Sequence, residues 1–245
     1  MRRVSMVLGR RNRVHALDDV SFDVSRREFC CLIGPSGCGK STLLSLMAGF
    51  MTPTRGQVLL DSRAASSDDL ARSVVFQEYA LFPWLTAVGN VEFGLASRGV
   101  REGRKDHAMT YLERVGLAKF AQAYPHELSG GMQQRVAIAR ALAMEPSFLL
   151  MDEPLGALDA LTRDQLQVLV ADLWQQFNQT VVYVTHNVSE AVFLADTVVV
   201  MTAHPGRLKD VVKIDLPRPR SLKDPRFAAY VGELTDLIVG SMSQV

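Results

Sequence analysis

The sequence predicts an α/β protein in which helices cover a parallel β-sheet. Short β-rich runs alternate with helical runs along the 245 residues, an order typical of parallel sheets. The run Phe29–Ile33 is continuously apolar, which indicates a strand buried on both faces. A glycine-rich segment follows this run and leads into an apolar helical segment. The length fits one domain, or one domain with a small inserted subdomain.

The expected strands are short and rich in apolar residues. The first is the alternating run Val20–Val24, and the buried run Phe29–Ile33 comes next. Later strands are expected at Gln57–Asp61, Val74–Phe76, Phe148–Met151, Val181–Thr185 and Thr197–Met201.

Helical patterns fill most of the remaining chain. The segment Asp159–Phe177 carries one apolar stripe with helical spacing, which predicts a helix that faces the core. Pro217 and Pro219 mark a break before a last helix, near Pro225–Val239. Other helices are expected at Leu43–Phe50, Val88–Leu95, Arg104–Val115 and Gly130–Met144.

The middle of the chain lacks a clear strand, so we interpret it as a helical insertion. The predicted organisation is one domain over residues 1–245. Its α/β core takes residues 1–87 and 145–215, the helical subdomain takes 88–144, and a short C-terminal extension takes 216–245.

Composition excludes several classes of protein. The formal net charge is +1, which argues against a protein built mainly to coat nucleic acid. No apolar run reaches the roughly 18 residues of a membrane span. The first residues lack the apolar core of a secretory signal, so we expect the chain to stay in the cytoplasm. Cys30, Cys31 and Cys38 cannot all pair and form no metal-binding CxxC, so they are interpreted as reduced thiols.

A phosphate-binding motif follows the buried strand that ends at Ile33. Its pattern is G-x-x-x-x-G-K-[ST], the P-loop pattern, and it lies between a strand and a helix as that motif requires. Glycines let successive amides point at phosphate oxygens, and the helix N-terminus adds positive charge. Lys40 is expected at the β- and γ-phosphates, with the Ser41 hydroxyl on Mg²⁺. The expected nucleotide contacts are Gly34, Pro35, Ser36, Gly37, Cys38, Gly39, Lys40, Ser41 and Thr42.

A second motif is the apolar run Phe148–Met151 that ends in two carboxylates, Asp152 and Glu153. A carboxylate at the end of a buried strand is costly unless it meets a metal or another partner. A strand beside the P-loop strand would place Asp152 near the Mg²⁺. Glu153 could then polarise the attacking water as a general base.

Between these motifs, residues Leu128–Arg135 read LSGGMQQR. This segment resembles the signature motif of ATP-binding cassette (ABC) ATPases. Ser129 is a good helix N-cap, and the following helix points its amides outward. The resemblance implies that Ser129, Gly130, Gly131 and Gln133 close on the γ-phosphate of ATP held by a second subunit, in a head-to-tail dimer.

The resemblance covers nearly the whole chain and adds three residues to the site. Gln77 is similar to the Q-loop glutamine, which senses Mg²⁺ and the transmembrane partner. Asp159, in Gly156–Asp159, is similar to the D-loop aspartate that contacts the other subunit. His186 is similar to the switch histidine at the γ-phosphate. The implied fold is a RecA-like P-loop core with an antiparallel β part and an inserted helical subdomain.

The N-terminus departs from the family pattern. Family members stack adenine on an aromatic residue upstream of the P-loop, but here no aromatic residue precedes Phe22. A gapless count places Arg11 at that position, and its planar guanidinium can stack on a ring. The first strand of the antiparallel part also looks partly missing: either the start is trimmed or the strand is minimal.

The tail suggests a subgroup within the family. The segments Met201–Arg207 and Ile214–Arg220 are similar to ATPases of nitrate, sulfonate and taurine importers, and so is Pro83–Thr86. The resemblance implies three kinds of partner: transmembrane permease subunits, a second ATPase subunit that forms a homodimer with this one, and indirectly a solute-binding protein. The chain would lie at the cytoplasmic face of the membrane. The apolar stretch Val75–Thr86 would receive the permease's coupling helix.

Three alternatives are weighed against an importer of small anions. An importer ATPase for another small solute fits the same motifs. A soluble ABC ATPase of nucleic-acid repair or translation usually has a long coiled-coil insertion or two cassettes, and this chain has neither. A P-loop kinase or GTPase would leave Ser129–Arg135 unexplained, and no NKxD guanine motif follows.

Overall fold

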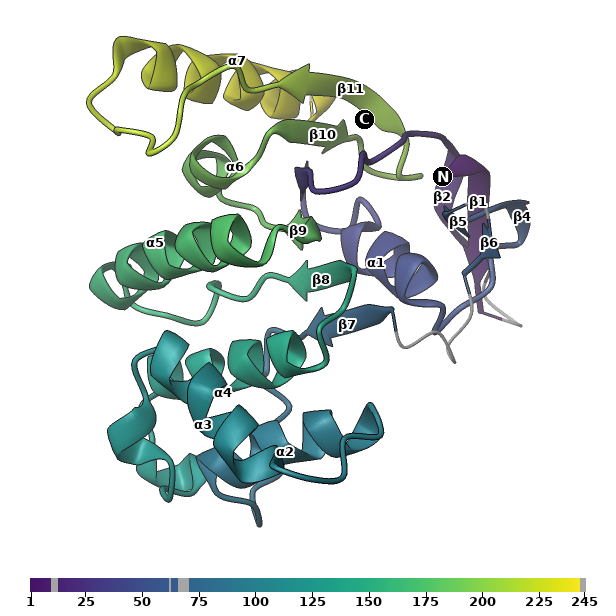
Figure 1. Ribbon diagram of the computed structural model, residues 1–245. Helices are drawn as coiled ribbons and strands as arrows, with labels where there is room; N and C mark the ends of the chain where they lie inside the picture. Colours follow the sequence, from purple (N-terminus) through teal and green to yellow (C-terminus); the bar gives the residue numbers. More distant parts are fainter. Residues whose placement is uncertain (10–12, 62, 66–70, 243–245) are drawn as a thin grey trace. The chain divides into compact units, whose positions relative to one another are not determined.

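A computed structural model describes residues 1–9, 13–61, 63–65 and 71–242 (Figure 1). The chain forms two compact units. The first joins Met1–Asp69 to Thr180–Val245, and the second is Leu70–Gln179.

The first unit contains a four-stranded sheet in the order β11-β10-β3-β9. Strands β3 (Phe29–Ile33), β9 (Thr180–Val184) and β10 (Thr197–Met201) are parallel, and β11 (Leu208–Lys213) runs antiparallel to β10. Every residue of β3, β9 and β10 is buried, as the continuous apolar runs require.

An antiparallel sheet in the order β2-β1-β4 completes the β structure near the N-terminus. It contains β1 (Arg2–Leu8), β2 (Val14–Val20) and β4 (Arg55–Gln57). The two-residue strands β5 (Leu59–Leu60) and β6 (Arg63–Ala64) pair with each other.

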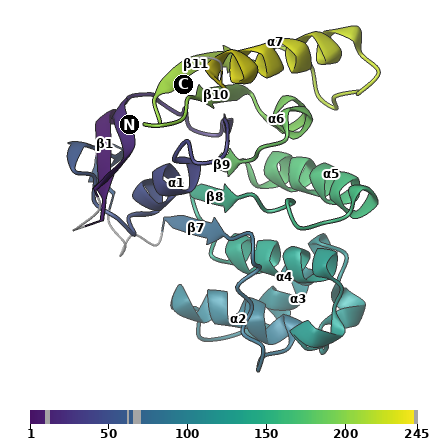
Figure 2. The same ribbon diagram turned by 180° about the vertical axis from the view of Figure 1, so that it is seen from behind.

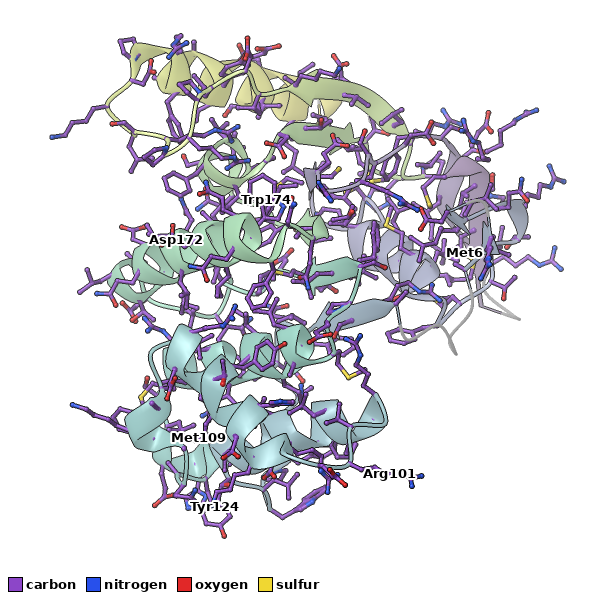
Figure 3. All side chains as sticks on the ribbon, in the orientation of Figure 1. Met6, Arg101, Met109, Tyr124, Asp172 and Trp174 are labelled. Carbon is purple, nitrogen blue, oxygen red and sulfur yellow. The ribbon has the colours of Figure 1, made fainter. Side chains whose placement is uncertain are left out.

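Two expectations about this region are wrong. The alternating run Val20–Val24 is not a strand, since β2 ends at Val20. The first strand is not minimal either, because β1 has seven residues and pairs with β2 on one side and β4 on the other. Its buried side chains include Met6, which is labelled in Figure 3.

Three helices lie in the described residues of the first unit. Helix α1 (Lys40–Ala48) ends earlier than the predicted Phe50, because Gly49 adopts a left-handed conformation and its N–H bonds back to Leu46. Helix α6 (Val188–Leu194), which was not predicted from the sequence, follows β9 directly, and α7 (Pro225–Met242) packs against it.

The second unit combines a parallel strand pair with helices. β7 (Arg72–Val75) pairs with β8 (Phe148–Asp152). Helices α2 (Ala87–Ser97), α3 (Arg104–Arg114) and α4 (Gly130–Ala143) lie against one another (Figure 2). Single turns lie at Ala118–Phe120 and Pro125–Glu127. Helix α5 (Ala160–Phe177) carries Trp174, which is labelled in Figure 3. Its indole N–H donates to the Gln179 carbonyl.

Among the described residues, no helix is long and apolar enough to span a bilayer.

Candidate nucleotide site

The glycine-rich loop follows β3 and leads into α1, as the motif predicts. Gly37 and Gly39 have φ angles of 77° and 87°, in the left-handed region that favours glycine. A Cβ on Gly39 would lie 2.7 Å from Leu17 Cδ2 and 2.9 Å from the Ala16 carbonyl oxygen. The loop therefore needs glycine at this position for both conformation and space.

Lys40 is buried inside this loop. Its Nζ donates to the carbonyl oxygens of Gly34 at 2.9 Å and Pro35 at 3.1 Å, and lies 3.6 Å from Cys38 Sγ. Only 7% of the residue is exposed, so the chain holds a cation within a cradle of backbone groups. Because an ammonium group binds phosphate as a point charge, this lysine is placed to meet an anion that enters the loop.

The turn between β10 and β11 packs on the same loop. Gly206 N–H donates to the Ala16 carbonyl at 3.0 Å, and a Cβ on Gly206 would lie 2.1 Å from the Cys38 carbonyl oxygen. The exposed His204 lies beside Gly37, with its Cε1 atom 3.3 Å from the position of a Cβ there. This contact was not predicted from the sequence.

His186 is exposed and comes just after β9. β9 lies parallel to β3, with Val184 opposite Leu32, and Thr185 N–H donates to the Leu32 carbonyl. Because parallel neighbours end at one edge of the sheet, His186 and the P-loop share that edge.

In the second unit, Gln77 and Glu153 converge. They follow the parallel strands β7 and β8, whose residues Val75 and Met151 are opposite each other. Gln77 Nε2 and Glu153 Oε2 each lie 3.5 Å from the position of a Cβ on Gly156. Glu153 has a left-handed φ of 43°, a strained conformation that often occurs at functional sites.

The signature segment begins α4. The Ser129 hydroxyl accepts a hydrogen bond from Met132 N–H and caps the helix, as predicted. A Cβ on Gly130 would lie 2.8 Å from the Tyr79 hydroxyl, and one on Gly131 only 2.4 Å from Thr162 Cγ2. The Gln133 side-chain amide donates to the Leu128 carbonyl, so it braces the start of the same helix.

Asp159 serves as the N-cap of α5. Its carboxylate accepts a hydrogen bond from Thr162 N–H at 3.0 Å, which lowers the pKa of Asp159 below its ordinary value. The side chain is exposed. The role at a dimer interface stays a prediction.

The residues expected to hold Mg²⁺ fit such an ion by their chemistry. Asp152 is the last residue of β8, Ser41 is the exposed second residue of α1, and Gln77 is exposed. Carboxylate, hydroxyl and amide oxygens are the hard donors that Mg²⁺ takes. The part of the chain that the structure describes has no group of three or more His, Cys, Asp or Glu side chains suited to a metal. An ion that keeps waters and substrate phosphates as ligands needs none.

A buried carboxylate that was not predicted from the sequence supports the segment around His186. Glu190 is 4% exposed and accepts hydrogen bonds from Thr185 Oγ1 at 2.8 Å and the Tyr183 hydroxyl at 3.1 Å. Asn187 caps α6 by accepting a hydrogen bond from Glu190 N–H. The available signal in the sequence was a carboxylate close behind the expected strand Val181–Thr185.

An exposed aromatic group follows Gln77. Trp84 and Phe93 are 71% and 47% exposed, and their rings lie 5.4 and 4.5 Å from that of Phe82. The buried Asn90 side chain fixes the segment, since its oxygen accepts from Phe82 N–H and its nitrogen donates to three carbonyl oxygens. We call Phe82, Trp84 and Phe93 the aromatic patch.

Two further sequence expectations concern Arg11 and the three cysteines. Arg11 lies outside the described residues. Cys30, Cys31 and Cys38 are free and buried, as expected for reduced thiols, and burial raises the pKa of each.

A glycine cradle around a buried lysine, between a buried strand and a helix, defines a P-loop nucleotide-binding protein. The family model for ABC transporters matches residues 17–156. The chain belongs to this family, and it is an ATP-binding protein and an ATPase.

Curated relatives match over most of their length. An uncharacterised ABC transporter ATP-binding protein of Methanocaldococcus jannaschii is 50% identical, over 93% of this chain and 85% of the relative. The nitrate import ATP-binding protein of Synechocystis sp. is 44% identical, over 95% and 91%. The taurine import ATP-binding protein of Burkholderia thailandensis is 48% identical, over 96% and 94%.

A solved structure supports the predicted fold class. It is a dimeric post-hydrolysis state of an ATP-binding cassette bound to ADP and Pi, with a TM-score of 0.76 and 33% identity. The match covers 88% of this chain and 98% of that one.

Proposed function

We propose that this chain is the ATP-hydrolysing subunit of an importer for a small anion of the nitrate, sulfonate or taurine type. The observation that carries the hydrolytic part is the convergence of Gln77 and Glu153 at Gly156. The relatives named for nitrate and taurine import support the cargo class.

Each loop has a distinct task in this proposal. The amides of residues 34–42 bind the ATP phosphates, and Lys40 exchanges its carbonyl partners for phosphate oxygens. Glu153 accepts a proton from the attacking water, and Gln77 holds that water by hydrogen bonding. His186, at the P-loop edge of the sheet, donates to the γ-phosphate. Ser41, Asp152 and Gln77 would hold Mg²⁺, which would supply positive charge beside the phosphates.

A second copy of the chain completes the ATP site. Ser129, Gly130 and Gly131 place the N-terminus of α4 on the γ-phosphate of ATP bound to the other copy, with Gln133 bracing that end. Asp159 lies at the same interface. The dimeric ATP-binding cassette among the similar structures supports this assembly.

The aromatic patch binds permease subunits, which hold the chain at the cytoplasmic face of the membrane. Exposed aromatic groups are the side chains that interfaces favour. A solute-binding protein delivers the cargo to the permease.

The test begins with the purified chain and its Mg²⁺-dependent ATPase activity. Glu153→Gln is expected to retain ATP binding, abolish turnover and accumulate a dimer in ATP, as measured by size-exclusion chromatography. Ordinary turnover by this variant would refute the assigned base. Lys40→Ala is the control for loss of binding.

The cargo is tested by growth of a strain that lacks the gene. Nitrate is supplied as sole nitrogen source, or taurine and alkanesulfonates as sole sulfur source, beside ammonium and sulfate controls. A defect on one source, restored by the wild-type gene and not by Lys40→Ala, is the expected result. Normal growth on all of them would reject this cargo class.

A further inference from the structure

The C-terminal segment 214–220 reaches the helix that follows His186. Arg220 is 8% exposed, and burial lowers the pKa of its guanidinium to about 10. A buried charge of this kind needs hydrogen-bond partners. Its guanidinium donates to five carbonyl oxygens, those of Val192 at 2.6 Å, Phe193 at 3.2 Å, Ala195 at 2.5 Å, Ile214 at 3.2 Å and Leu216 at 3.3 Å.

These contacts satisfy the C-terminal end of α6. The last four carbonyls of a helix have no partner within it. Ala195 N–H donates to the Ala191 carbonyl, and the Arg220 guanidinium donates to the carbonyls of Val192 and Phe193. The Arg218 guanidinium donates to the fourth carbonyl, that of Leu194, at 2.6 Å, and to Asp196 Oδ1 at 2.7 Å.

The arginines matter because α6 has only seven residues. A helix this short is unstable alone, so tertiary contacts must hold it. Two cations at its C-terminus also complement the helix dipole. Arg218 and Arg220 therefore fix the end of α6 that lies farthest from His186 in the chain.

The opposite end of α6 fixes the backbone on both sides of His186. Asn187 N–H donates to Thr185 Oγ1 at 3.0 Å, and Thr185 Oγ1 donates to Glu190. Glu190 lies on α6 itself, so a shift of the helix moves the partners of residues 185 and 187 together.

We propose that Arg220 is a positioning residue for His186, acting through α6, with Arg218 in a supporting role. This inference rests on the proposed contact of His186 with the γ-phosphate. The segment Pro217–Arg220 would then contribute to ATP hydrolysis, independently of any contact with cargo.

The test uses the full chain and the conservative variant Arg220→Lys, which keeps the charge but has fewer donors in a different geometry. We expect kcat per bound nucleotide to fall about 10- to 100-fold, the scale of a displaced catalytic group. The KM for ATP is expected to stay near the wild-type value, since the P-loop is untouched. Arg226→Met is the matched control, because Arg226 is exposed and pairs with Asp224.

A double-mutant cycle with His186→Ala separates positioning from general loss of structure. If Arg220 acts through His186, Arg220→Lys causes no further loss of single-turnover rate when His186 is absent. An equal loss in both backgrounds, or an unchanged kcat in Arg220→Lys, would overturn the proposal. Arg218→Met, which removes fewer bonds, is measured in the same cycle in case Arg220→Lys does not fold. The proposed function is checked separately by wild-type ATPase activity and Lys40→Ala.

Discussion

The close approach of Gly131 to Thr162 yields a quantitative prediction for Gly131→Ala. A Cβ at Gly131 would lie 2.4 Å from Thr162 Cγ2, far inside van der Waals contact, while its next neighbour, Leu166 Cδ1, is at an ordinary 3.5 Å. Overpacking a well-packed site costs about 1–3 kcal/mol. Replacing glycine by alanine within a helix returns about 1 kcal/mol of helix propensity. The net loss of unfolding free energy is therefore about 1 kcal/mol.

Thr162→Ser provides the matched background, because serine lacks Cγ2 and keeps the hydroxyl. In that background Gly131→Ala meets no close atom, so the expected effect is neutral or a gain of up to about 1 kcal/mol. The difference between the two backgrounds is the clash itself, about 1–3 kcal/mol. Urea unfolding followed by the fluorescence of Trp174, on the same helix as Thr162, measures all four proteins. An equal effect of Gly131→Ala in both backgrounds would show that this contact does not make glycine necessary.

Three further outcomes are expected. Lys40→Ala removes a charge-assisted contact worth about 1.5–3 kcal/mol, so the ATP Kd from fluorescent-analogue titration rises about 10- to 100-fold; an unchanged Kd contradicts the P-loop assignment. Trp84→Ala leaves ATPase activity and thermal stability near wild type, since the side chain is 71% exposed, but permease subunits are lost on co-purification; full retention would place the interface elsewhere. Because the folded-state pKa of Asp159 is depressed, its capping contribution is present above the unfolded pKa of about 3.9 and is lost as pH falls through the folded value. Asp159→Ala should therefore destabilise at pH 7 more than near pH 2 in urea titrations, and equal losses at both values count against the cap.

The sequence predicted the P-loop and the strand ending at Asp152 well, because those features are local. A glycine pattern, a buried apolar run and a helix start are each encoded by adjacent residues. The Ser129 cap was predictable for the same reason. The convergence of Gln77 and Glu153 could be expected only through the family resemblance, since 75 intervening residues separate the two segments in the chain.

The failures arose where distant partners decide the structure. Val20–Val24 alternates like a strand, yet pairing with β1 places the strand earlier, over Val14–Val20. Helix α6 is too short for a clear periodic signal, and its stability comes from Glu190 and Arg220. Periodicity within a window cannot detect a guanidinium that reaches back from the C-terminal segment.

Helix α4 connects the aromatic patch with the signature segment, because Arg140 near its C-terminal end contacts the patch and Gly130 begins it. The Arg140 guanidinium donates to the carbonyl oxygens of Ala80 and Tyr79 and lies 5.8 Å from the Phe82 ring centroid. At the other end of the same helix, the Tyr79 hydroxyl approaches Gly130. Helix α4 has 14 residues and is therefore about 21 Å long. Helix α4 would therefore transmit a displacement of the aromatic patch, such as a bound protein could cause, to the amides at Gly130 and Gly131.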